Sequence, residues 1–138
     1  MSIIESVRNY ILNFPELKDG RLQVDFLDTK AVEYTVETVP VNPLIKRYTD
    51  GGKKKQYNFV FASREFFGPD VNQNIENLSF YEKFSDWIEE QNDKRIFPDL
   101  GPEREVQSIE ILTSGYMYEM DTDNARYQIQ CRVIYEEE

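Results

Sequence analysis

The residues that could most readily take part in chemistry are DGGKKK, residues 50–55, where a glycine pair stands beside three lysines. A phosphate-binding loop of the P-loop type needs glycines spaced so that successive amides point inward, a final Lys-Ser/Thr and a helix that follows at once. None of these is present, because Tyr57 to Ala62 alternate as a strand does. Asp-Gly and Gly-Gly pairs favour a tight hairpin turn, since glycine accepts a positive φ. We therefore expect a β-hairpin, with Lys53, Lys54 and Lys55 on an exposed basic arm.

Other residues that could do chemistry are few. The chain has no histidine and one cysteine, Cys131, which removes Ser-His and Cys-His nucleophilic pairs and almost every zinc ligand. Cys131 stands at an apolar position of an expected strand, where cysteine usually behaves as a small buried hydrophobe. A carboxylate pair or an oxygen-only metal site would be the remaining route to an enzyme.

The segment Asp121 to Asn124 has the alternating oxygens that open a calcium loop. The EF-hand pattern then requires a glycine and a later bidentate glutamate, whereas Arg126 and strand-forming residues follow here. Asp and Asn also favour turns, so we interpret the segment as a hairpin tip. We expect no catalytic residue, no cofactor and no metal.

Composition limits the class of protein further. A length of 138 residues suits one domain, and nine Tyr, nine Phe and one Trp supply ample apolar surface for a core. The formal net charge is −10, and such a field repels polyphosphate, so DNA or RNA binding as the main activity is disfavoured.

The sequence also indicates where the protein resides. The N-terminal MSIIESVRNYILN has no basic leader and carries Glu5 and Arg8 where a signal peptide would be apolar. No run approaches the roughly 20 apolar residues that span a bilayer. A single cysteine fits a reducing cytoplasm. We expect a soluble intracellular protein without a membrane partner.

Two helices are predicted. Ser2 and Glu5 form a capping-box pattern, and apolar residues recur at helical spacing as far as Phe14, which predicts a helix from Ser2 to Asn13. Ser79-Phe80-Tyr81-Glu82 repeats the capping pattern and predicts a second helix from Ser79 to Asn92, with Ile75 to Leu78 as an irregular or 3₁₀ lead-in. Phe84 and Trp87 should then be largely buried on its apolar face.

Period-two alternation predicts the strands. The first two are Leu22 to Phe26 and Val32 to Glu37, joined by a bend at Asp28 to Lys30, with Lys18 to Gly20 as the preceding turn. Pro40 and Pro43 indicate a crossing or edge segment before Leu44 to Thr49. Two long strands, from Val106 to Met120 and from Tyr127 to Tyr135, close the chain. The expected fold is a single α+β domain over residues 1–138, an antiparallel or mixed sheet with two main helices packed on it.

The order of the expected elements along the chain resembles that of one phage family. The segments that carry this resemblance are VPVNP, the hairpin IKRYTDGGKKKQYNFVFASREFFG, the helix NIENLSFYEKFSDWIEEQ and a closing β-hairpin. Nearly the entire chain, from VEYTVETVPVNP to the last strand, is similar to minor capsid or tail terminator proteins from tail gene clusters of phages and prophages of Gram-positive bacteria. The resemblance implies a non-enzymatic protein of the virion tail or neck, assembled in the host cytoplasm. Its subunits would form a ring, typically a hexamer, that caps the tail tube and meets the head-tail connector proteins.

The residue chemistry is compatible with such a ring. Acidic residues around a conduit would let DNA pass without binding it specifically. Exposed hairpins are natural donors for subunit contacts, and the candidate interface residues are Tyr48, Asp50, Lys53, Lys54, Lys55 and Tyr57. Two alternatives remain open, another neck or minor capsid component and a small carboxylate-based ligand-binding domain or enzyme.

Overall fold

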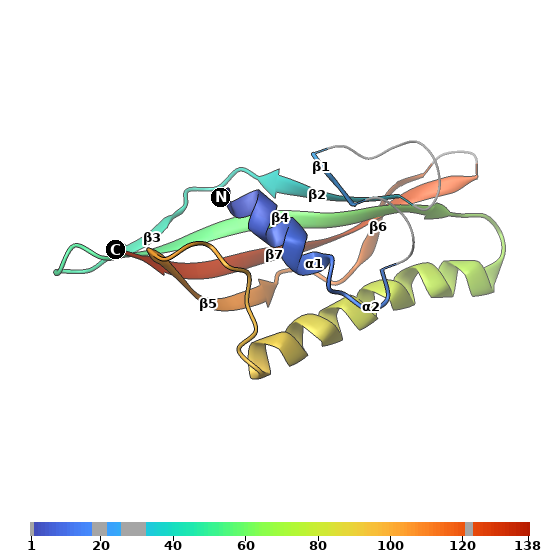
Figure 1. Cartoon of the computed structure of the whole chain (residues 1–138). Helices are drawn as coiled ribbons and strands as arrows, with labels where there is room; N and C mark the ends of the chain where they lie inside the picture. Colours follow the sequence, from blue (N-terminus) through green and yellow to red (C-terminus); the bar gives the residue numbers. More distant parts are fainter. Residues whose placement is uncertain (1, 18–21, 26–32, 121–122) are drawn as a thin grey trace.

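The chain forms a single α+β domain in which two helices pack on a seven-stranded mixed sheet, as the sequence predicts (Figure 1). The structure is a computed structural model, and it describes residues 2–17, 22–25, 33–120 and 123–138. Three predicted turns fall wholly or partly outside these ranges, namely Lys18 to Gly20, Asp28 to Lys30 and Asp121 to Asn124.

Two long antiparallel strands form the centre of the sheet. They are β4 (Lys53–Phe66) and β7 (Asn124–Glu137), paired along their whole lengths. On the far side of β4 lie β2 (Glu33–Val39) and then β1 (Leu22–Val24), with β3 (Leu44–Arg47) pairing the first residues of β4. The outer side of β7 is shared by β5 (Arg104–Ile111) and β6 (Tyr116–Met120). The sheet order is therefore β1-β2-β4-β7-β5, with β3 and β6 each attached to one central strand.

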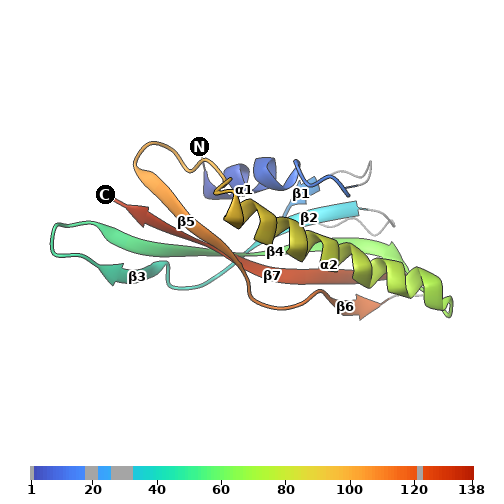
Figure 2. The same cartoon turned by 90° about the horizontal axis from the view of Figure 1, so that it is seen from below.

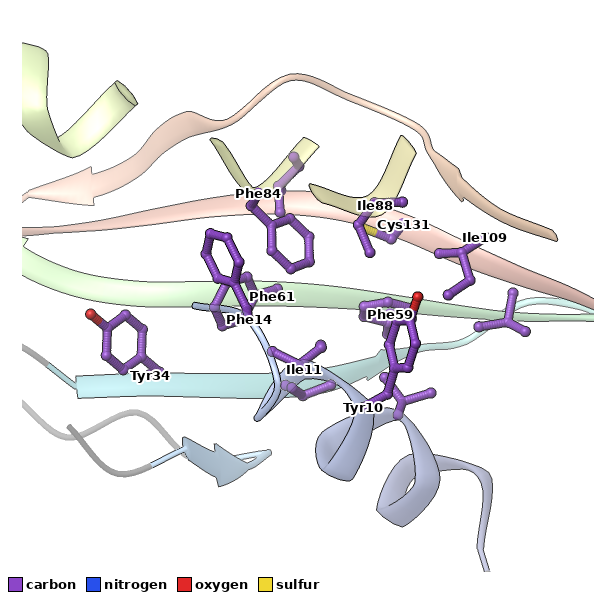
Figure 3. Packing of buried hydrophobic residues seen from close by; sticks show 14 of the residues in the cluster. Tyr10, Ile11, Phe14, Tyr34, Phe59, Phe61, Phe84, Ile88, Ile109 and Cys131 are labelled. Carbon is purple, nitrogen blue, oxygen red and sulfur yellow. The ribbon is translucent and has the colours of Figure 1, made fainter. Parts of the chain in front are cut away.

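Both helices, α1 (Ile3–Ile11) and α2 (Val71–Asp93), lie over the same face of this sheet (Figure 2). Alternate residues of the central strands point to that face, where Phe59 and Phe61 meet Phe84 and Ile88 of α2 (Figure 3). The core is rich in aromatic rings, and Phe61 lies 4.8 Å from Phe84 between ring centroids. Neither of these helices covers the other face (Figure 2).

Helix α1 begins where the sequence predicts. Ser2 is its N-cap and accepts a hydrogen bond from the Glu5 amide at 3.3 Å, which satisfies one of the amides that a helix start leaves unpaired. The helix ends at Ile11, two residues before the expected end. Val7, Ile11 and Phe14 are all buried, which confirms the predicted apolar stripe.

Helix α2 begins eight residues before the predicted start at Ser79. Asp70 is the N-cap, and its carboxylate accepts from the amides of Asn72 and Gln73. The expected lead-in from Ile75 to Leu78 is therefore regular α-helix. Phe84 is fully buried, as expected, and Trp87 is partly buried against the core.

Strands β1 and β2 occur where two strands were predicted, and they run parallel, with Leu22 opposite Tyr34. One strand prediction is wrong. The expected strand from Val106 to Met120 is two strands, because the chain leaves the ladder at residues 112–115. Gly115 lies in this break and allows α2 to approach closely, since a Cβ there would stand 2.3 Å from the Cβ of Tyr81.

Candidate functional site

The glycine pair forms the predicted hairpin turn. The Tyr48 amide donates to the Gly52 carbonyl at 2.8 Å, and the Gly51 amide donates back to the Tyr48 carbonyl at 3.1 Å. Gly51 has a φ of +94°, a region that side chains disfavour. The Asp50 carboxylate closes the turn by accepting from the Gly52 amide at 3.0 Å. We name residues 44–57, which comprise β3, the turn and the start of β4, the basic hairpin.

The three lysines are not on an exposed arm, so this part of the prediction is wrong. Lys53, Lys54 and Lys55 belong to β4 and are half-buried. Their strand pairs with β3 on one side and with the end of β7 on the other, where Lys53 stands opposite Glu137. The backbone of the lysine run is thus interior to the sheet, and only the turn, residues 48–52, projects past the neighbouring strands (Figure 2).

Because successive side chains of a strand point to opposite faces of the sheet, neighbouring lysines of β4 lie on different faces. Lys55 points to the helix-bearing face, where its Nζ lies 2.6 Å from Oε1 of Glu137. The other oxygen of Glu137 accepts from Nε of Arg104 at 3.0 Å. These hydrogen bonds lower the pKa of Glu137 below its usual range, so this carboxylate stays ionised and joins β4, β5 and β7. Lys54 points to the opposite face, beside Glu136.

The two tyrosines of the predicted interface lie apart. Tyr48 donates to the Glu136 carboxylate at 3.2 Å, and Nζ of Lys46 lies 5.4 Å above its ring. Tyr57 is half-buried further along β4, with its hydroxyl 2.6 Å from that of Thr38. The structure therefore groups Tyr48, Asp50 and Lys53 around the turn and places Tyr57 outside that group.

A hollow of about 230 Å³ lies between the turn, the start of β5 and the end of β7. Six carboxylates and two cationic side chains line it, which makes it strongly acidic: Asp50, Lys53, Glu103, Arg104, Glu105, Glu136, Glu137 and Glu138. No sequence pattern predicts this group, because its members come from three segments that the strand pairing of β4, β5 and β7 brings together. The run EEE at residues 136–138 was the one local sign of it.

Several cations of the basic hairpin lack an ion-pair partner in the described part of the chain. Among the residues that the structure describes, Lys46, Arg47, Lys53 and Lys54 form no ion pair within 4.0 Å. By contrast, the arginines of the central sheet are paired, for example Arg126 with Glu37 at 2.9 Å. The basic hairpin thus presents positive charge that another molecule can neutralise.

The described residues contain no group of three or more acidic, histidine or cysteine side chains arranged to hold a metal ion. Burial raises the pKa of the Cys131 thiol, which keeps it protonated and unreactive. In the part of the chain that the structure covers, neither helix combines the length and apolarity that crossing a membrane requires. No protein-family model matches the sequence, and no curated protein matches it.

Proposed function

We propose that this protein is a structural subunit of a phage or prophage tail, similar to a tail terminator, and that its copies form a ring at the head-proximal end of the tail tube. The observation that carries the proposal is the basic hairpin, in which four cations form no ion pair with a described residue, on a chain with a formal net charge of −10. Its other support is the chain-wide resemblance to tail terminators. The proposed ring, typically a hexamer, would contact the tail tube protein on one side and the head-tail connector proteins on the other.

Charge gives this assembly a physical rationale. Residues 46–55 hold five cationic side chains and one acidic side chain, whereas the rest of the chain is acidic. An exposed ion pair within one molecule contributes little, but complementary charges across a contact select the partner and fix its register. A ring needs heterologous contacts, in which one surface meets a different surface of the neighbour. The exposed cations of β3, Lys46 and Arg47, supply one such surface on an acidic protein.

The same charge balance suits a conduit for DNA. Lumen residues that repel the phosphate backbone leave the genome mobile, so DNA passes without specific binding. We expect no membrane partner. The assembled protein would reside in the tail or neck of the virion, and the free subunit in the cytoplasm of the bacterial host.

A carboxylate-based ligand-binding domain or enzyme is the second candidate, and the acidic hollow is the observation that favours it. The lowered pKa of Glu137 argues against a general acid at that position, because an acid catalyst must hold its proton near the working pH. Another neck or minor capsid component would share the class of the first proposal. Tail tube and tape-measure genes beside this gene would favour the terminator.

Tail assembly after deletion or mutation of the gene tests the proposal. Deletion should yield tails of uncontrolled length, or tails that do not join heads, in electron micrographs of an induced or infected culture. Lys53→Glu/Lys54→Glu should give the same defect in a folded protein, because it reverses two unpaired charges and leaves the ion pair of Lys55 intact.

The matched control is Lys83→Glu/Lys94→Glu, which reverses two exposed lysines, one in α2 and one at its C-cap. This control should assemble normally. Normal virions from the hairpin variant would show that the hairpin has no role in assembly. Normal virions from the deletion would refute the proposed function as a whole.

A further inference from the structure

Two of the outer strand edges are closed by side chains from the helices. The side-chain amide of Asn92 in α2 donates to the Ile109 carbonyl at 2.7 Å and accepts from the Ile109 amide at 3.0 Å. It thereby occupies both outward backbone groups of one residue of β5. On the other side of the sheet, Nε of Arg8 in α1 donates to the Leu22 carbonyl of β1 at 2.9 Å. Covering an edge in this way prevents another strand from pairing with it.

The edges of β3 and β6 are not closed in this way. On β3, the Leu44 amide donates to the side chain of Asn42, and no further described side chain bonds to the outer backbone of that strand. Likewise, β6 pairs with β7, and no residue that the structure describes bonds to its outer side. An open edge is a row of unpaired amides and carbonyls, which makes it a template for a strand from another chain.

These two open edges belong to opposite sides of the strand order and lie at opposite ends of the sheet. Strand β3 borders β4, while β6 borders β7 on its far side. Figures 1 and 2 both place β3 at the end of the domain that holds the turn of the basic hairpin, and β6 at the other end. One molecule cannot join them to each other. A contact between β3 of one copy and β6 of the next is heterologous, which is the kind that closes rings.

Exposed apolar side chains occur on both open strands. Ile45 of β3 is 44% exposed, and Met117, Tyr118 and Met120 of β6 are 42%, 59% and 65% exposed. Apolar side chains gathered on an unpaired edge are typical of a surface that another protein covers.

The charges of the two edges are complementary. Lys46 and Arg47 of β3 are exposed and form no ion pair with a described residue. On β6, the side chain of Glu119 is 56% exposed although one of its oxygens contacts Arg64. Opposite charges facing each other across neighbouring strands stabilise a pair, whereas like charges destabilise it. Complementarity therefore favours β3 against β6 over β3 against β3.

We propose that the occupant of both edges is a second copy of this chain: strand β3 of one copy adds to the outer edge of β6 of the next, so that the sheet continues from subunit to subunit. This inference rests on the proposed ring and names the surfaces that form it. The exposed apolar residues of β6 then pack against Ile45, and the cations of β3 meet Glu119.

Cysteine pairs test this contact directly. The native Cys131 is fully buried, so new exposed cysteines give the only reactive thiols expected in the folded protein. Ile45→Cys and Tyr118→Cys proteins are made separately and treated with a mild oxidant, alone and mixed, at about 1 mM, where contacts of millimolar Kd are populated. Disulfide-linked dimers are expected in the mixture and not in either protein alone.

The matched control is Leu12→Cys at the C-cap of α1, which has the same 44% exposure as Ile45 and belongs to neither open strand. Crosslinking of Ile45→Cys with itself would indicate a two-fold contact and overturn the proposal. A mixture that crosslinks no more than the Leu12→Cys control would also overturn it. The proposed function has a separate test, since the deletion experiment can fail while the crosslink forms, or succeed while the crosslink is absent.

Discussion

Gly115 is the residue at which helix and sheet come closest. Tyr81 is buried beside it, with its hydroxyl 2.5 Å from Oγ of Ser63 and 3.0 Å from the Tyr127 carbonyl. These bonds fix the ring, so the Cβ and Cγ of Tyr81 cannot retreat from a neighbouring side chain. A Cβ at Gly115 would lie 2.3 Å and 2.6 Å from them. A glycine is therefore required at this position, because the chain before β6 and helix α2 approach each other closely there.

Gly115→Ala should destabilise the protein by about 1 to 3 kcal/mol, the usual cost of overfilling a packed core. Urea denaturation followed by circular dichroism measures the change. The matched control is Gly68→Ala, because a Cβ at Gly68 meets nothing within 4 Å. If both variants unfold at the same urea concentration, the contact with Tyr81 does not constrain this position.

At the scale of the elements, helix α2 has two candidate starts, and only one is used. Asp70 accepts from Asn72 at 3.0 Å and from Gln73 at 3.4 Å, whereas Ser79 lies in the middle of the helix. Asp70→Ala should therefore cost about 1 kcal/mol, within the range of 0.5 to 2 typical of lost N-caps. Ser79→Ala, the comparison variant, should change the unfolding free energy by a few tenths of a kcal/mol at most. A larger loss from Ser79→Ala than from Asp70→Ala would favour the shorter helix.

Local patterns predicted the elements that depend on neighbouring residues alone. The cap at Ser2, the turn at Gly51 and the alternation of β7 all come from residues close in sequence, and all are confirmed. The start of α2 was missed because its first turns, including Val71 and Ile75, keep apolar side chains in solvent, so the segment lacks an evident buried stripe.

Long-range pairing explains the remaining differences. The break at Gly115 depends on contact with Tyr81, which lies in another element. The candidate site shows the same limit. Sequence located the hairpin, but it could not show that Lys55 meets Glu137, 82 residues later, or that β7 covers the lysine run. Strand register between distant segments is not encoded in any local pattern.

At the scale of the whole molecule, the two faces of the sheet differ in chemistry. One face packs on the helices, and the other holds a network of paired side chains. Arg126 donates two hydrogen bonds to the Glu37 carboxylate, and Arg132 donates to the side chains of both Glu110 and Gln56. Charges that are already paired gain little from a partner, whereas among the described residues the edges of β3 and β6 keep unpaired backbone groups and exposed apolar side chains. We therefore infer that assembly proceeds through the edges of the sheet.

The two helices and the sheet are expected to unfold as one cooperative unit. Phe14, just after α1, packs its ring 5.5 Å, 5.3 Å and 5.4 Å from those of Phe80, Phe84 and Trp87 in α2. Because α1, α2 and the sheet share this core, they should unfold together, and Trp87 fluorescence and far-ultraviolet circular dichroism should give one urea midpoint. Phe14→Ala should lower both midpoints equally, with a loss of about 3 to 5 kcal/mol. The control is Leu12→Ala, which truncates an exposed side chain of the same segment and should change the free energy of unfolding by about 0.5 kcal/mol or less. A fluorescence transition that precedes the loss of secondary structure in Phe14→Ala would show that α1 docks as a separate unit.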